Sequence, residues 1–94
     1  MIQCFACRET ARVFAGERSR KLAGDMQETA RRKLIMMDAA ARLEDLRIPP
    51  GNRLEALRGN RAGQYSIRIN QQWRVCFRWT EKGPADVEIA DYHP

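Results

Sequence analysis

The spacing of apolar residues along the 94-residue chain changes once, near the middle. In the first half, apolar positions recur at steps of three and four, which is the period of an amphipathic helix. Asp25 precedes this stripe and Glu28 follows it by three positions, so the pair predicts a helix N-terminus closed by a capping box. The residues of the stripe are Met26, Ala30, Leu34, Met37 and Ala41.

The sequence RIPPGN at residues 47–52 ends the helical half, because two prolines and a glycine do not continue a helix. Beyond it, a short apolar stretch at residues 54–57 is followed by runs in which apolar and polar residues alternate, as in half-buried strands. Short turns between these runs imply antiparallel pairing. The apolar positions are Tyr65, Ile67 and Ile69, then Trp73, Val75, Phe77 and Trp79, and then Val87 and Ile89.

Together these patterns predict one α+β domain over residues 1–94, in which two N-terminal helices pack on an antiparallel sheet of about four strands. A short opening strand at residues 2–5 and a helix ending near Ala15 are expected before the apolar stripe. Alternation puts Arg68, Arg74 and Arg78 on the open sheet face, turned away from the helices. It puts Tyr92 on the same face, with Asp91 and His93 at the end of that face. Strand pairing is expected to hold the C-terminal tail to about Ala90.

The net charge of +5 is concentrated in residues 47–79, which hold seven basic residues and a single acid, Glu55. All seven basic residues are arginine, whose planar guanidinium suits bidentate phosphate binding and keeps its charge. A polyanionic partner is therefore expected, with a merely solvated surface as the alternative. The seven are Arg47, Arg53, Arg58, Arg61, Arg68, Arg74 and Arg78.

The sequence favours a cytoplasmic protein without membrane contact, because no apolar run approaches the roughly 20 residues of a membrane span. Charged residues from Arg8 onward also interrupt any signal-peptide pattern. Cys4 and Cys7 have C-x-x-C spacing, but Cys76 and His93 lack the paired spacing of a second half-site. No metal and no cofactor are therefore expected. The odd number of cysteines also argues against a disulfide framework.

The chain ends in ADYHP, which brings a carboxylate, a phenol and an imidazole together at Asp91, Tyr92 and His93. Metal-independent RNA cleavage uses such groups. A base takes the proton from a 2′-hydroxyl, an acid protonates the departing 5′-oxygen, and cations stabilise the phosphorane between them. On residue types alone this is one interpretation among several, since a single histidine is more often structural.

The run RIPPGNRLEALRGNRAGQYSIRINQQWRVCFRW at residues 47–79, followed by DVEIADYH at residues 86–93, resembles the HigB branch of the RelE/ParE toxin superfamily. The resemblance implies a RelE-like, microbial-ribonuclease-like fold and cleavage of mRNA in the ribosomal A site. It also implies a HigA-like antitoxin with a helix-turn-helix domain, which silences the toxin and represses their operon. Contact with DNA would then be only indirect, through the antitoxin.

The resemblance also assigns residues. Some family members carry a histidine where this chain has Glu55, so either Glu55 serves as the base or that role is vacant and is shared by other groups. Apart from the resemblance, the arginine-rich segment 47–79 leads us to expect RNA binding by Arg61, Arg68 and Arg78. The catalytic residues expected from the family pattern are Arg58, Arg74, Asp91, Tyr92 and His93, with Glu55 as the variable member.

Two other functions remain open from the sequence. A toxin of the ParE kind would share the fold but act on gyrase through protein contacts, which would make the C-terminal Asp-Tyr-His dispensable. A noncatalytic RNA-binding module would use the arginines without cutting any substrate.

Overall fold

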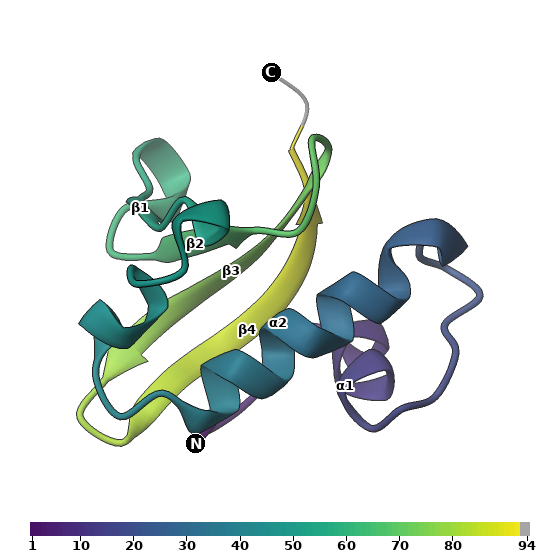
Figure 1. The fold of residues 1–94 in the computed structure, drawn as a ribbon, viewed down its shortest axis with the longest axis horizontal. Coiled ribbons are helices and arrows are strands. Elements are labelled where there is room, and N and C mark those ends of the chain that lie inside the picture. The colour runs from purple at the N-terminus through teal and green to yellow at the C-terminus, as the bar shows by residue number, and fades with distance from the viewer. Residues whose placement is uncertain (93–94) are drawn as a thin grey trace.

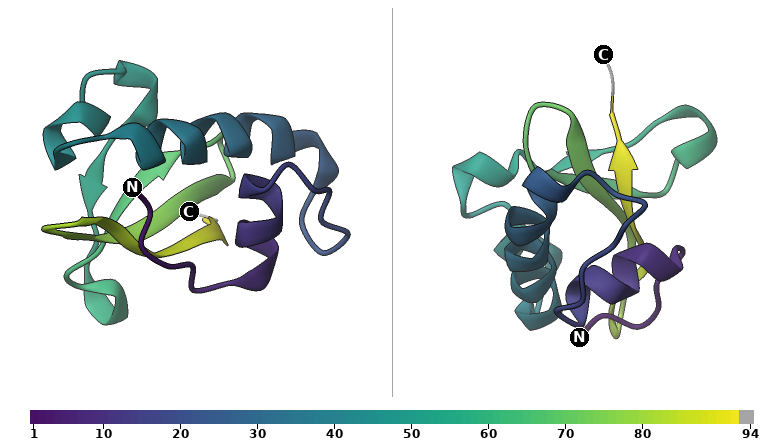
Figure 2. Two further views of the ribbon diagram at one scale, coloured as in Figure 1. Left: turned by 90° about the horizontal axis from the view of Figure 1, so that it is seen from below. Right: turned by 90° about the vertical axis from the view of Figure 1, so that its right-hand side faces the viewer.

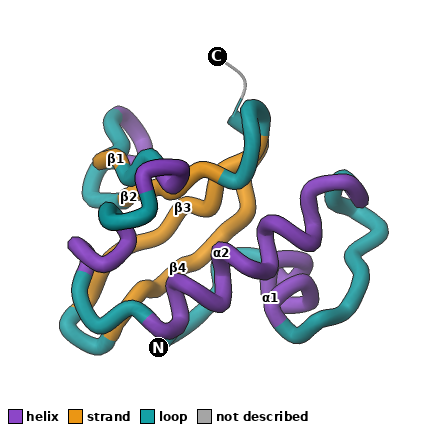
Figure 3. The backbone as a smooth tube through the Cα atoms, viewed as in Figure 1, coloured by secondary structure: helices purple, strands orange, loops and turns teal. Residues whose placement is uncertain are grey.

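The computed structural model describes residues 1–92, which form two α-helices and one four-stranded sheet (Figure 1). The strands follow one another in the order β1-β2-β3-β4, and every neighbouring pair is antiparallel, as the alternation predicts. Between α2 and β2 the chain consists mainly of loop and single helical turns (Figure 3). The bounds are α1 Arg8–Phe14, α2 Gln27–Ala39, β1 Glu55–Ala56, β2 Tyr65–Arg68, β3 Trp73–Thr80 and β4 Gly83–Asp91.

The hydrophobic core lies between α2 and one face of the sheet (Figure 2). Ala30, Leu34 and Met37 of α2 are completely buried, which confirms most of the predicted stripe. They pack against the apolar residues of the strands, while α1 contacts both α2 and β4. The fully buried strand residues of this core are Ile67, Val75, Phe77 and Val87.

The start of the chain and α1 close the outer edge of β4. Phe5 forms a single parallel bridge with Val87, and the Val87 N–H donates a hydrogen bond of 3.1 Å to the Cys4 carbonyl. Further along the same edge, the Ile89 N–H donates a buried hydrogen bond of 2.9 Å to the Thr10 hydroxyl of α1. An unpaired strand edge invites association with other chains, so these contacts also protect the sheet. The predicted strand at residues 2–5 is reduced to the one bridge.

The predicted capping box at Asp25 and Glu28 is absent. Residues Gly24–Met26 form a 3-10 turn, α2 begins at Gln27, and no side chain caps it at Met26. The first residue of α2 instead uses its own side chain to hold the preceding loop, a contact that local spacing does not reveal. The helix also ends at Ala39, so Ala40 rather than the predicted Ala41 is buried. Within the described residues, no helix has the length and apolarity needed to cross a membrane.

The Thr10–Ile89 hydrogen bond yields a stability prediction. Thr10→Val preserves the side-chain shape but leaves the buried Ile89 N–H without its acceptor, which costs about 1–3 kcal/mol of unfolding free energy. Chemical denaturation of the two proteins measures the difference. Thr29→Val is the matched control, because its hydroxyl only accepts from the exposed Arg32 guanidinium. Equal losses in both variants would contradict the assigned role of Thr10.

Candidate active site

The sheet face opposite the helices carries rows of polar residues set by the strand register. Residues directly opposite each other on neighbouring strands point to the same face. One row runs from Glu55 through Ser66 and Cys76 to Glu88. The next row holds Arg68 directly opposite Arg74, followed by Ala90 on β4.

Arg74 is the most firmly held cation of this face. Its Nε donates a hydrogen bond of 2.6 Å to the Ser66 hydroxyl, and its Nη2 donates one of 2.6 Å to the Arg53 carbonyl. Only 12% of the side chain is exposed, and Glu55 Oε1 lies 3.9 Å from Nε. Because the guanidinium has lost its rotational freedom on folding, binding an anion requires little further ordering.

Arg68 and Arg74 form a pair of like charges on adjacent strands. Like charges directly opposite each other destabilise a sheet. Arg68 donates from Nε to the Asn70 carbonyl at 3.1 Å, which fixes its direction but does not neutralise it. An anion placed between the two guanidinium groups would remove the repulsion, so the pair has the electrostatics of a phosphate site.

These arginines line a surface pocket of about 360 Å³. Tyr92 enters it from the C-terminal end of β4, where the Tyr92 N–H donates a hydrogen bond of 2.6 Å to the Gln72 carbonyl. The tail is therefore held beyond Ala90, and Tyr92 shares a pocket with Arg74, as the alternation predicts. The pocket is lined by Arg53, Glu55, Arg68, Asn70, Gln71, Arg74 and Tyr92.

A buried amide sets the position of the segment that carries Arg53. Asn52 is completely buried, donates from Nδ2 to the Leu46 carbonyl at 3.0 Å and accepts from Lys33 Nζ at 2.6 Å. Burial, followed by the nearby charges of Arg32 and Arg68, lowers the pKa of Lys33. The next residue, Arg53, adopts a left-handed conformation with φ 45°, which is uncommon for a residue with a Cβ.

Comparisons with known proteins show the family of the chain. The model of the family described as "RelE-like toxin of type II toxin-antitoxin system HigB" matches residues 4–93. The chain belongs to this HigB family of RelE-like toxins.

Two curated proteins and one solved structure are similar to this chain. Toxin HigB-1 of Vibrio cholerae serotype O1 is 46% identical over 65 residues, which cover 69% of this chain and 68% of the relative. An uncharacterized protein of Haemophilus influenzae is 36% identical over 64 residues, covering 68% of this chain and 63% of its own length. A chain of the solved structure titled "YoeB-YefM complex from Staphylococcus aureus" has the same fold, with a TM-score of 0.61 at 18% identity, covering 100% of this chain and 99% of that chain.

Four of the predicted site residues meet in the pocket, and the others lie elsewhere or outside the described residues. Glu55, Arg68, Arg74 and Tyr92 line it together. Asp91 is paired in register with Trp73, on the helix side of the sheet, and accepts a hydrogen bond of 3.1 Å from Gln72 Nε2. The expectation that concerns His93 falls outside the described residues.

Three predicted arginines do not line the pocket. Arg58 is exposed at the start of the Gly59–Arg61 turn. Arg61 forms an ion pair of 3.1 Å with Glu88. Arg78 is bound to Asp86 at 2.6 Å and lies four residues along β3 from Arg74, which corresponds to about 13 Å. Asp86 sits at a register shift in β4 with φ 51°, so this ion pair stabilises an irregularity of the hairpin.

Three pocket residues, Arg53, Asn70 and Gln71, were not among the predicted site residues, although Arg53 is one of the seven arginines of the basic segment. Asn70 is a turn residue whose side-chain oxygen accepts the N–H groups of Gln72 and Trp73, both at 2.8 Å. The NQQ segment signals a tight β2–β3 turn, but only the register shows that this turn borders the pocket.

The polar face of the sheet is also less open than predicted. Ser66 and Cys76 are completely buried, and the Arg61 side chain reaches from the β1–β2 connection to Glu88, the register partner of Cys76. Burial raises the pKa of the Cys76 thiol, and the Arg61 charge only partly opposes this effect. The arginines thus cover part of the sheet themselves, as long side chains with apolar stems do.

This coverage predicts that two of the three free cysteines, Cys76 and Cys4, react at different rates. A thiolate is the reactive form, so at pH 8 a disulfide reagent should modify the buried Cys76 roughly a hundredfold more slowly than the exposed Cys4. Arg61→Ala should accelerate labelling of Cys76, whereas Lys82→Ala should not. Mass spectrometry of time points locates the label. Equal rates at Cys4 and Cys76 in the native protein would contradict the coverage.

Proposed function

We propose that this toxin is a ribosome-dependent endoribonuclease, which acts in the cytoplasm and cleaves mRNA in the ribosomal A site. A HigA-like helix-turn-helix antitoxin is proposed to silence it. The observation that carries the proposal is the convergence of two facing arginines with a phenol and a carboxylate in one pocket. Membership in the HigB family supports the toxin role and the antitoxin partner.

The proposed reaction is attack of a ribose 2′-oxygen on the adjacent phosphorus, with departure of the 5′-oxygen. One proton must leave the 2′-hydroxyl and one must reach the 5′-oxygen, so the products are a 2′,3′-cyclic phosphate and a 5′-hydroxyl. The phosphorane formed between these steps carries extra negative charge on its equatorial oxygens. Groups that are already oriented toward that charge lower the barrier most.

The pocket residues divide these tasks by their chemistry. Arg74, fixed by Ser66 and the Arg53 carbonyl, holds the phosphate and stabilises the phosphorane together with Arg68. The phenol of Tyr92 carries an O–H group and protonates the leaving 5′-oxygen. Glu55 Oε1 lies 3.9 Å from Arg74 Nε. In the proposal its carboxylate acts as the general base that accepts the proton of the 2′-hydroxyl.

The remaining predicted residues keep supporting roles in this proposal. His93 shares proton transfer with Glu55, while Asp91, on the helix side of the sheet, holds the tail through Gln72. Arg58, Arg61 and Arg78 contact RNA outside the pocket. Few groups carry the chemistry, so the ribosome is proposed to align the mRNA for attack. Correct alignment of the reacting atoms alone contributes a large part of such rate enhancements.

Loss of the Arg74 guanidinium should weaken mRNA binding and slow the chemical step. Arg74→Ala is expected to lower the cleavage rate at least about a hundredfold and to weaken mRNA capture as well, since one group serves both steps. Mapping of mRNA 5′ ends after incubation with programmed ribosomes measures the rate. Arg42→Ala removes an exposed arginine outside the pocket and serves as the control. Cleavage by Arg74→Ala at the control's rate would refute the assignment.

Tyr92→Phe separates chemistry from binding. It removes the phenolic proton and keeps the ring, so the single-turnover rate should fall by about 10²–10⁴ while ribosome affinity stays unchanged. Rapid-quench measurements at saturating ribosomes, paired with sedimentation binding, give both quantities. Growth inhibition by a Tyr92→Phe protein equal to that of the wild type would favour a gyrase-directed or purely binding toxin instead.

A further inference from the structure

One completely buried asparagine, Asn52, lies immediately before Arg53 of the pocket but does not line the pocket itself. Its Oδ1 accepts a hydrogen bond of 2.6 Å from Lys33 Nζ. Its Nδ2 donates to the Leu46 carbonyl at 3.0 Å and to Met36 Sδ at 3.2 Å. Lys33 and Met36 belong to α2, so Asn52 is held in one position by this helix and by the segment that follows it.

This anchoring fixes the turn in which Arg53 adopts its left-handed conformation. Residues Pro50–Asn52 form a single 3-10 turn, which the Arg53 N–H closes with a hydrogen bond of 3.3 Å to the Pro50 carbonyl. Arg53 then has φ 45° and ψ 55°, which is unfavourable for a residue with a Cβ. Such a conformation persists only where the surrounding contacts impose it, and the contacts of the preceding Asn52 do so here.

The Arg53 carbonyl is one of two supports of the Arg74 guanidinium. Ser66 on β2 accepts from Arg74 Nε at 2.6 Å, while Arg53 on the connection accepts from Nη2 at 2.6 Å. Nη2 also lies 3.3 Å from the Ser66 carbonyl, so its short hydrogen bond is the one to Arg53. The two short bonds together define the plane of the guanidinium, and they leave the two N–H groups of Nη1 as donors for a phosphate.

We propose that Asn52 is a positioning residue for mRNA cleavage, because it holds the Arg53 carbonyl where that carbonyl orients the Arg74 guanidinium. Lys33 acts one step further away, as the anchor of Asn52 on α2. Misplacement of a group in an active site by about 1 Å can slow a reaction about a hundredfold. This inference deepens the proposed function and rests on it.

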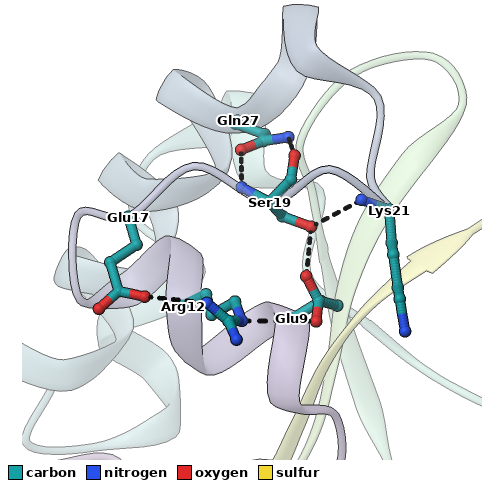
Figure 4. Close-up of polar contacts among 6 residues, drawn as sticks. All are labelled: Glu9, Arg12, Glu17, Ser19, Lys21 and Gln27. Carbon is teal, nitrogen blue, oxygen red and sulfur yellow. Dashed lines mark hydrogen bonds and ion pairs between the residues drawn. The ribbon is translucent and has the colours of Figure 1, made fainter.

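A second buried amide provides a matched control. Gln27, at the start of α2, is 7% exposed and exchanges two hydrogen bonds with the Ser19 backbone, at 3.0 Å and 2.8 Å (Figure 4). Like Asn52, it ties a connection to α2, but the loop that it holds contributes no residue to the candidate active site. Asn52→Leu and Gln27→Leu therefore both remove a buried amide, and only the first removes a support of Arg74.

The test measures single-turnover cleavage of mRNA at saturating programmed ribosomes, at a temperature where both variants are folded by circular dichroism. Asn52→Leu is expected to cut about ten- to a hundredfold more slowly than the wild type, whereas Gln27→Leu keeps the rate. Lys33→Met removes the ammonium partner of Asn52, and its rate should fall between the two. In an Arg74→Lys background, which has no Nη2 for the Arg53 carbonyl to hold, Asn52→Leu should cause no further loss.

A pair of substitutions at Arg53 tests the same point without changing the buried amide. Arg53→Gly and Arg53→Val lose the same side-chain charge, but only valine disfavours the left-handed conformation. The valine variant should therefore cut about tenfold more slowly than the glycine variant. Equal rates of the two variants would overturn the positioning role, even if Asn52→Leu does not fold.

The NMR spectrum of the Arg74 guanidinium gives a readout that does not depend on cleavage. A guanidinium held at both Nε and Nη2 rotates slowly, so Nη1 and Nη2 should give separate signals in the wild type and in Gln27→Leu. Asn52→Leu should merge them. Merged signals in the wild type, or separate signals in Asn52→Leu, would overturn the proposed support.

The outcomes distinguish this inference from the proposed function. Cleavage by Asn52→Leu at the rate of Gln27→Leu, with Arg74→Ala slow, overturns the positioning role and leaves the endoribonuclease standing. Additive losses in the Arg74→Lys background have the same meaning. A wild type that cuts no ribosome-bound mRNA overturns the proposed function, and the role of Asn52 in cleavage with it.

Discussion

The candidate site depends on one constraint, the register that sets Arg74 opposite Arg68 and beside Ser66. Shifting β3 by one residue against β2 would turn Arg74 into the core and Val75 to the polar face, so burial of Val75 and Phe77 fixes the direction of the arginine. The same register ends β4 where Tyr92 enters the pocket. Packing of the core and placement of the charged groups are thus two consequences of one alignment.

The register sets the like charges of Arg68 and Arg74 opposite each other, and this repulsion suggests that the pair binds an anion. A fold under selection for stability alone has no reason to set two arginines face to face, while a phosphate site needs such a pair. The strained φ of Arg53 fits the same pattern, since its carbonyl accepts the Arg74 guanidinium. Lys33 and the buried Asn52 connect this segment to α2, so the core helix supports the geometry of the pocket.

Periodicity predicted the strands and the core well because burial of Val75, Phe77, Val87 and Ile89 is a direct outcome of alternation. It failed where tertiary contacts override local preference. Asp25 does not cap α2, since the Gly24–Met26 turn precedes the helix and Gln27 binds the loop at Ser19. Arg53, Asn70 and Gln71 were missed for a related reason. They come from connections, and nothing local in the sequence tells which turns border one pocket.

The most direct test of the central claim is a change in the substrate rather than in the protein. An mRNA carrying a single 2′-deoxyribose at the mapped cleavage position, bound in programmed ribosomes, removes the proposed nucleophile and leaves every phosphate in place. The account predicts that the toxin binds this complex normally and leaves that position uncut. Cleavage there at the rate of the all-ribose mRNA would contradict it.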